Sequence, residues 1–237
     1  MFPVVAVEGL TKRYGAFTAL DGVGFSVRRG EVLGLIGPNG AGKTTLLECL
    51  AGVRPFDAGT IRIDDEPVAP GTPDGRLFYL PDGIAPWRAE RVSWVLDYAV
   101  GFFGGSAAAR QAVVDDLQLT PLLGSRIGTL SKGQRKRVLL AVGLVVPHPV
   151  LLCDEPFDGL DLRQTRDVGA VLRRAAERGR TLFLSIHQIS DAARVCDRFV
   201  LLSGGRTVGE GTADELAARL PVTAGTPSLE EVVLGLT

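Results

Sequence analysis

Residues Gly37 to Thr44, which read GPNGAGKT, combine glycines with a lysine and a hydroxyl at a spacing that suits a phosphate chain. The stretch fits the pattern G-x-x-x-x-G-K-[ST]. Its glycines let successive backbone N–H groups point at phosphate oxygens, and a following helix adds its positive N-terminus. The alternative, a glycine-rich turn without a ligand, gives no role to the lysine. We therefore expect a nucleotide to bind through Gly37, Asn39, Gly40, Ala41, Gly42, Lys43, Thr44 and Thr45.

Within this loop Lys43 is expected to place its charge on the β- and γ-phosphates and Thr44 to offer its hydroxyl to Mg²⁺. Two carboxylates are candidates for the remaining chemistry. The apolar run Val150 to Cys153 delivers Asp154 and Glu155 to the end of a predicted strand. Asp154 suits Mg²⁺, and Glu155 is placed to polarise an attacking water. The alternative is a pair of acids that caps the next helix.

His187 ends the next apolar run in the same way. A single histidine is more often structural than catalytic. Here, however, several strand ends are expected to meet in one crevice, where α/β proteins bind their ligands. We expect His187 to contact the γ-phosphate.

A second glycine-centred turn lies in LSKGQ, residues 130–134. Ser131 and Gln134 have capping-box spacing around Gly133, so an ordinary helix start is one interpretation. The other is a second anion site at a helix N-terminus, beside Lys132 or Arg135. Because this turn lies in a different part of the fold, we expect it to close the phosphate site of a second copy in a head-to-tail dimer.

The elements that must position these residues indicate an α/β protein. Short apolar runs at 31–37, 150–155 and 181–187 are typical of buried parallel strands, and residues 42–52 predict a helix after the phosphate loop. Antiparallel pairing is indicated by the alternating segments at 4–15 and 25–30, and a further strand is expected at 59–65. Residues 198–211 indicate a hairpin. We expect one domain with an α/β core at 1–83 and 148–211, a helical subdomain at 84–147 and a tail at 212–237. In the tail, Thr212 with Glu215 and Ser228 with Glu231 have cap spacing.

Composition excludes several function classes. The 237 residues carry a net charge of −1, which gives no electrostatic case for nucleic acid binding. The longest apolar run, Val138 to Val146, is far shorter than the roughly 20 residues of a membrane span. The N-terminus lacks the features of a signal peptide, and Cys49, Cys153 and Cys196 are expected to be free thiols of a reducing compartment.

Taken in order, these motifs resemble those of the nucleotide-binding subunit of ATP-binding cassette (ABC) transporters, in a prokaryotic exporter-like branch. The resemblance runs from about residue 4 to the end. It includes Tyr14 at the adenine-stacking position, LSKGQ as the signature, Glu155 as general base, GLD at 159–161 as the loop between subunits, and His187 as the switch histidine. It implies a P-loop NTPase fold: a RecA-like core, an N-terminal antiparallel β subdomain and an inserted helical subdomain.

The resemblance also implies function. We expect an ATPase that needs ATP and Mg²⁺ and pairs head-to-tail with itself or a paralogous subunit. It would drive a separate integral membrane permease from the cytoplasmic face of the membrane, as a peripheral subunit and without nucleic acid. Export is favoured over import. A non-transport ABC ATPase, for example one of iron–sulfur assembly, stays open, whereas a P-loop kinase leaves LSKGQ unexplained.

Two positions depart from the family pattern. Asp82 stands where a glutamine that contacts Mg²⁺ and the attacking water is usual, and Lys132 replaces the commoner glycine of the signature. Asp82 keeps an oxygen ligand but cannot donate a hydrogen bond, and it adds negative charge near the γ-phosphate, so we expect weaker sensing of the membrane partner or a stronger Mg²⁺ dependence. Trp87, nearby, is expected either to dock a permease helix or to pack in the core.

Overall fold

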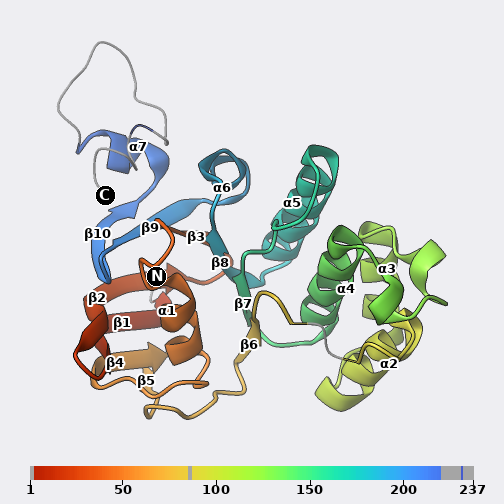
Figure 1. The fold of residues 1–237 in the computed structure, drawn as a ribbon, viewed down its shortest axis with the longest axis horizontal. Coiled ribbons are helices and arrows are strands. Elements are labelled where there is room, and N and C mark those ends of the chain that lie inside the picture. The colour runs from red at the N-terminus through yellow and green to blue at the C-terminus, as the bar shows by residue number, and fades with distance from the viewer. Residues whose placement is uncertain (1–2, 85–86, 220–230, 232–237) are drawn as a thin grey trace.

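The computed structural model describes residues 3–84, 87–219 and 231, and it has two sheets (Figure 1). The larger has the strand order β10-β9-β3-β8-β7-β6, in which all neighbours are parallel except the pair β9 and β10. Its strands are β3 (Val32–Ile36), β6 (Leu77–Leu80), β7 (Val150–Asp154), β8 (Thr181–Ile186), β9 (Arg198–Ser203) and β10 (Arg206–Gly211). This arrangement is the parallel core that the apolar runs predict.

Side chains of this sheet alternate between two hydrophobic clusters. In β7, Leu151 and Cys153 belong to one cluster, and Val150 and Leu152 belong to the other. Successive strand residues point to opposite faces, so an uninterrupted apolar run is stable only when both faces are covered. One face packs against α5 (Leu162–Glu177) and α6 (Ile189–Val195), and the other packs against α1 (Lys43–Leu50).

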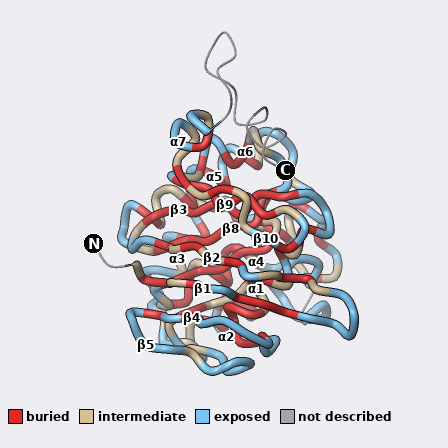
Figure 2. Tube along the Cα trace, turned by 90° about the vertical axis from the view of Figure 1, so that its left-hand side faces the viewer, coloured by how far each residue is buried: buried red, intermediate tan, exposed pale blue. Residues whose placement is uncertain are grey.

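The second sheet is antiparallel, with the strand order β2-β1-β4-β5. Its bounds are β1 (Pro3–Tyr14), β2 (Phe17–Arg28), β4 (Ala58–Ile63) and β5 (Glu66–Pro67). Residues of β1, β2 and β4 share a cluster with α1, so α1 is buried between the two sheets (Figures 1 and 2). This burial fixes the helix that follows the phosphate loop.

Between β6 and β7 the described chain forms the helices α2 (Val92–Phe103), α3 (Ala107–Asp116) and α4 (Lys132–Val145), with short 3₁₀ turns at Thr120–Leu122 and Ile127–Thr129. In Figure 1 the three helices lie together beyond β6 and β7. Val92, Val95, Leu96 and Ala99 are buried, as their spacing indicates. Phe102, in the same apolar pattern, is instead 68% exposed.

The remaining expectations on local structure are met where they can be compared. The β9–β10 hairpin turns at Gly204 and Gly205, and α7 (Ala213–Ala217) starts with a capping box of Thr212 and Glu215. The cap expected at Ser228 lies outside the described residues. All three cysteines are free. In the described part of the chain no helix combines the length and the hydrophobicity that a membrane span requires.

Candidate functional site

The carboxyl ends of four neighbouring parallel strands carry the candidate catalytic residues. The phosphate loop follows β3, and His187 follows β8. Asp154 ends β7 with Glu155 directly after it, and Asp82 follows β6. Because β3, β8, β7 and β6 are adjacent and parallel, these residues share one edge of the sheet. Segments up to 150 positions apart in sequence therefore meet at a single site. The sequence pattern predicts this for the ends of β3, β7 and β8, whereas β6, which places Asp82, is not among the predicted strands.

The phosphate loop has a backbone that glycine alone adopts without strain. Gly40 and Gly42 have φ of +81° and +103°, a region that L side chains avoid. A Cβ on Gly37 would lie 2.2 Å from the carbonyl oxygen of Leu202. The Lys43 Nζ donates to the carbonyl oxygens of Gly37 and Pro38 at 2.8 and 3.2 Å, so it lies over the loop.

An open pocket surrounds this loop, and its lining suits a nucleotide. Tyr14, 41% exposed, and Phe17 stand at one part of it, where an aromatic ring can stack on a base. The lining includes nearly all of the predicted loop contacts and also Glu155: Asn39, Gly40, Gly42, Lys43, Thr44, Thr45 and Glu155, with Ala19. Gly37 and Ala41 are buried behind it.

Thr44 and Asp154 form the candidate Mg²⁺ site. Thr44 Oγ1 donates to Asp154 Oδ2 at 2.8 Å, and Asp154 Oδ1 accepts from the buried Ser185 hydroxyl. Mg²⁺ takes hard oxygen ligands, commonly one or two carboxylates completed by substrate phosphates and water. The Thr44 hydroxyl and the Asp154 carboxylate are oxygen ligands of the kind that suits this ion. In the described chain no cluster of three or more His, Cys, Asp or Glu residues could hold a metal alone.

Glu155 is held in an unusual backbone conformation. Its φ is +50°, a left-handed value that is uncommon for residues other than glycine. Its N–H donates to Ser185 Oγ at 2.9 Å. Burial raises the pKa of its carboxyl, while the charges of Lys43 and His187 act in the opposite direction. The Glu155 side chain is half-buried and lies close enough to Lys43 and His187 for their charges to affect it.

His187 is exposed at the end of β8 and lines a second pocket with Asn39, Glu155 and Asp158. That pocket shares Asn39 and Glu155 with the pocket around Lys43. His187 thus borders the region next to the phosphate loop, where a γ-phosphate contact requires it to be.

Asp82 has a partner that sequence reasoning missed. Lys136 Nζ donates to Asp82 Oδ1 at 2.7 Å and to the carbonyl oxygen of Glu155 at 2.8 Å. The lysine lies in a run of basic residues, Arg135 to Arg137, and no local pattern shows which of the three enters the site. The available signal is that Gly133, Lys136, Leu140 and Gly143 recur at helical spacing, and all four are buried.

The signature turn LSKGQ is a capped helix start. Ser131 Oγ accepts from the N–H of Gln134 at 3.2 Å, and Gln134 Oε1 accepts from the N–H of Ser131 at 3.0 Å. A Cβ on Gly133 would lie 2.7 Å from Gln164 Oε1 and 3.0 Å from the Gly159 carbonyl oxygen. The nearby Lys132 forms an ion pair with Asp158 at 2.7 Å. None of the described residues 130–134 lines the pocket around Lys43.

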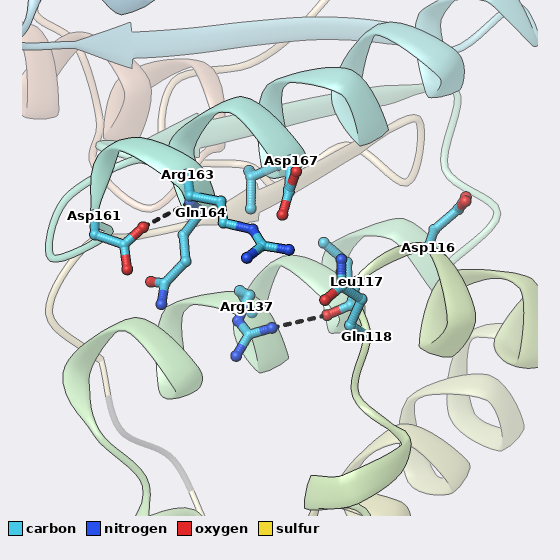
Figure 3. Close-up of a pocket in the computed structure, with 9 residues that line it drawn as sticks. Asp116, Leu117, Gln118, Arg137, Asp161, Arg163, Gln164 and Asp167 are labelled. Atoms are coloured by element: carbon cyan, nitrogen blue, oxygen red, sulfur yellow. Dashed lines mark hydrogen bonds between the residues drawn. The ribbon is translucent and has the colours of Figure 1, made fainter.

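A separate cleft lies between α5 and the helical segment, by which we mean the described chain from α2 to α4 (Figure 3). Asp161, Arg163, Gln164 and Asp167 line one side, and Arg137 with residues 116–118 line the other. Its lining mixes acidic and basic side chains and includes no glycine-rich loop. The pocket around Lys43 is therefore the better candidate for a nucleotide.

The order and placement of these motifs agree with what comparison with known proteins finds. The ABC transporter family model matches residues 20–158, more than half of the chain. The chain belongs to the ABC transporter family. Its fold is the α/β fold of the family's ATP-binding subunits, and it is an ATP-binding subunit of an ABC transporter.

Relatives of this ABC subunit include proteins named for opposite directions of transport. An uncharacterized ABC transporter ATP-binding protein of Methanocaldococcus jannaschii is 32% identical over 93% of this chain and 82% of its own length. A Nod factor export ATP-binding protein I of Ralstonia nicotianae is 35% identical over 90% of this chain and 68% of its own. A phosphonates import ATP-binding protein of Natronomonas pharaonis is 39% identical over 86% and 92%.

Solved structures support the same assignment. The ATP-binding subunit of an ABC transporter superposes with a TM-score of 0.87 at 28% identity, over 98% of this chain and 99% of that chain. The ATP-bound structure of a bacterial Atm1-family ABC exporter gives a TM-score of 0.80 at 26% identity, over 92% of this chain but 40% of that chain. ABC transporter subunits of this kind work with membrane components.

Proposed function

We propose that this ABC subunit hydrolyses ATP with Mg²⁺ and thereby powers export through a separate membrane permease, from the cytoplasmic face of the membrane. The observation that carries the proposal is the convergence of Lys43, Thr44 and Glu155 on one pocket, with Asp154 hydrogen-bonded to Thr44 beside it. A phosphate cradle, an oxygen pair suited to Mg²⁺ and a half-buried carboxylate together supply the parts that phosphoryl transfer to water requires.

In the proposed mechanism the loop from Gly37 to Gly42 binds the phosphates, and Lys43 neutralises the β- and γ-oxygens. Thr44 and Asp154 would hold Mg²⁺, which would supply charge neutralisation of the phosphates. The carboxylate of Glu155 accepts a hydrogen bond from the attacking water and takes its proton as the water oxygen bonds to the γ-phosphorus. The bond from that phosphorus to the β–γ bridging oxygen breaks, and ADP and phosphate leave. His187, in the pocket that shares Asn39 and Glu155 with the pocket around Lys43, would contact the γ-phosphate, and Asp82 is a further candidate oxygen ligand of Mg²⁺.

The proposal includes a head-to-tail dimer with a second copy or a paralogous subunit. The pocket around Lys43 is open, and in the described chain Ser131, Gly133 and Gln134 do not line it. The signature turn lies instead beside the Gly159–Asp161 loop of its own chain. A facing subunit would bring its own Ser131 hydroxyl, Gly133 and Gln134 to the open side, so ATP would hold the pair together.

Exposed aromatic side chains support a membrane partner. Trp87, Trp94, Tyr98 and Phe102, hereafter the aromatic face, are 41–68% exposed and form successive ring contacts with centroids 5.3–5.8 Å apart. Clustered exposed aromatics are characteristic of protein interfaces. Trp87 is thus outside the core, and the aromatic face follows Asp82 along the chain. We propose it as the docking site of the permease.

Hydrolysis is tested by steady-state ATPase assays on the purified chain with and without Mg²⁺. Glu155→Gln should bind ATP but lose at least about 10²-fold in hydrolysis, the usual scale for a general base. Full activity in this variant would remove Glu155 from the mechanism. Absence of ATP hydrolysis by the wild-type chain, alone or with its permease, would contradict the proposal itself.

Docking is tested by co-purification from membranes. Trp94→Ala combined with Phe102→Ala should lose the permease while ATP binding stays unchanged, because neither residue lines the nucleotide pocket. Val53→Ala, which removes an exposed apolar side chain away from the aromatic face and outside the nucleotide pocket, is the control and should retain the permease. Retention by the double variant would place the docking site elsewhere.

The direction of transport is tested in membrane vesicles that contain the subunit and its permease. Inside-out vesicles incubated with a cell extract should accumulate the cargo when ATP is added, as mass spectrometry of their contents would show. Vesicles with Glu155→Gln are the control. ATP-dependent accumulation in right-side-out vesicles loaded with ATP, and none in inside-out vesicles, would identify an importer.

A further inference from the structure

Lys136 occupies a buried position that a basic side chain rarely takes. It is 8% exposed, on the face of α4 that also carries Gly133, Leu140 and Gly143. A Cβ on Gly143 would lie 2.4 Å from the side chain of Leu80, so this face packs against the catalytic sheet. Burying a charge is unfavourable unless it is paired and hydrogen-bonded.

Two contacts compensate the Lys136 charge, and both reach catalytic candidates. Nζ donates to Asp82 Oδ1 at 2.7 Å and to the Glu155 carbonyl oxygen at 2.8 Å. The first joins α4 to the segment after β6, and the second joins it to the end of β7. One ammonium therefore connects the helix of the signature turn to the backbone of the candidate base.

The Glu155 backbone is held from both sides. Its N–H donates to Ser185 Oγ on β8, and its carbonyl oxygen accepts from Lys136 on α4. Left-handed φ values in residues other than glycine persist only when the surroundings enforce them. Residue 155 has this φ of +50° with three polar anchors on its backbone: the Ser185 hydroxyl, Lys136, and the Asp158 N–H, which donates to the same carbonyl oxygen at 3.2 Å. Of these three, only Lys136 belongs to α4.

We propose that Lys136 is a positioning residue, which sets the orientation of the Glu155 carboxylate according to the position of the signature helix. This inference rests on the proposed ATPase function. A movement of α4 relative to the sheet would change the Lys136 contacts and hence the place of the base. Asp82 holds the ammonium over the Glu155 carbonyl.

The test is Lys136→Met in the full chain, with Arg137→Met as the matched control. Arg137 follows directly on α4 and donates to the Leu117 carbonyl oxygen, away from Asp82 and Glu155. We expect Lys136→Met to lower kcat roughly 10- to 100-fold, the scale of a displaced catalytic group. Its affinity for a fluorescent ATP analogue should stay within about twofold of wild type, because Lys136 does not line the nucleotide pocket. Arg137→Met should keep kcat.

Conservative variants separate positioning from folding. Lys136→Arg keeps the positive charge and the hydrogen-bond donors, so its kcat should be higher than that of Lys136→Met. Lys136→Gln can still donate to one acceptor, so its kcat should lie between those of the Arg and Met variants. If Lys136→Met unfolds, the comparison of the Gln and Arg variants with wild type carries the test. A kcat within twofold of wild type in the Met or Gln variant, while Glu155→Gln is inactive, would overturn the positioning role alone. Loss of ATP affinity with unchanged kcat would overturn it too. An inactive wild-type chain would overturn the proposed function first.

Discussion

Thr44 and Asp154 lie 110 positions apart in sequence, yet the Thr44 hydroxyl donates to Asp154 Oδ2 at 2.8 Å. Thr44 is the second residue of α1, directly after the phosphate loop, and Asp154 ends β7. The contact thus joins the nucleotide-binding segment to the candidate catalytic strand. It also gathers two oxygen ligands of the kind that Mg²⁺ prefers.

Asp154→Asn should therefore weaken the use of Mg²⁺. The amide loses the negative charge, so we expect the Mg²⁺ concentration for half-maximal hydrolysis to rise roughly tenfold, equivalent to about 1.4 kcal/mol of binding free energy. A Mg²⁺ titration of ATPase activity measures it. Asp116→Asn, whose carboxylate instead pairs with Arg174 remote from the nucleotide pocket, is the control and should titrate as wild type. Identical titrations for both variants would contradict the Mg²⁺ assignment.

Glu155 should give the activity an acidic limb at higher pH than an ordinary glutamate. Burial raises its pKa above the usual 4.5, and a general base must be ionised, so kcat should fall as pH decreases through the raised pKa. A pH–rate profile at saturating ATP measures the limb. A limb below pH 4.5, or none, would exclude Glu155 as the titrating base.

The same pKa shift predicts a pH-dependent stability difference. A carboxyl whose folded pKa is raised stabilises the fold below its unfolded pKa and loses that contribution as pH rises through the folded pKa. The glutamine of Glu155→Gln does not ionise, so the variant does not lose this stabilisation as pH rises. Urea unfolding should therefore give the variant a higher free energy of unfolding than wild type at about pH 8 and a similar one near pH 4. The opposite order at pH 8 would contradict the sign of the shift.

The phosphate loop and the buried strands beside it could be predicted from the sequence, because each is encoded by a local pattern. The phosphate loop has an unusual composition, and the apolar runs before Asp154 and His187 have few alternatives to buried parallel strands. The convergence of their ends then follows from sheet geometry. The Lys136 bridge could not be predicted in the same way, because three consecutive basic residues are equivalent until the packing of α4 on β6 and β7 selects one. The exposure of Phe102 likewise depends on which side of α2 meets α4, which helical spacing does not fix.

Asp82→Gln restores the residue that is usual in the family and removes the ion pair with Lys136. A glutamine can still accept from Lys136 and can also donate to an attacking water. We expect turnover to change by roughly twofold or more and to depend less steeply on Mg²⁺, because one negative charge is lost near the γ-phosphate. Unchanged turnover with an unchanged Mg²⁺ response would show that Asp82 does not take part.

Gly133→Ala tests the tight contact between the signature turn and the Gly159 loop. An added Cβ would meet the Gly159 carbonyl oxygen at 3.0 Å, so we expect the free energy of unfolding to fall by roughly 1 kcal/mol, the lower end for overpacking. Gly101→Ala is the matched control, since it lies in α2 with open space around it and should gain up to about 1 kcal/mol from helix propensity. Equal gains in both variants would mean that the turn is not tightly packed.

The most direct test of the head-to-tail pair is the mass in solution of Glu155→Gln with ATP and Mg²⁺, measured by light scattering after gel filtration. We expect a dimer that carries two ATP molecules and that returns to monomer when ATP is removed. Adding Ser131→Arg should leave ATP binding by the isolated subunit intact and abolish the dimer, because Ser131 does not line its own pocket. A Glu155→Gln chain that binds ATP fully yet stays monomeric would contradict the account.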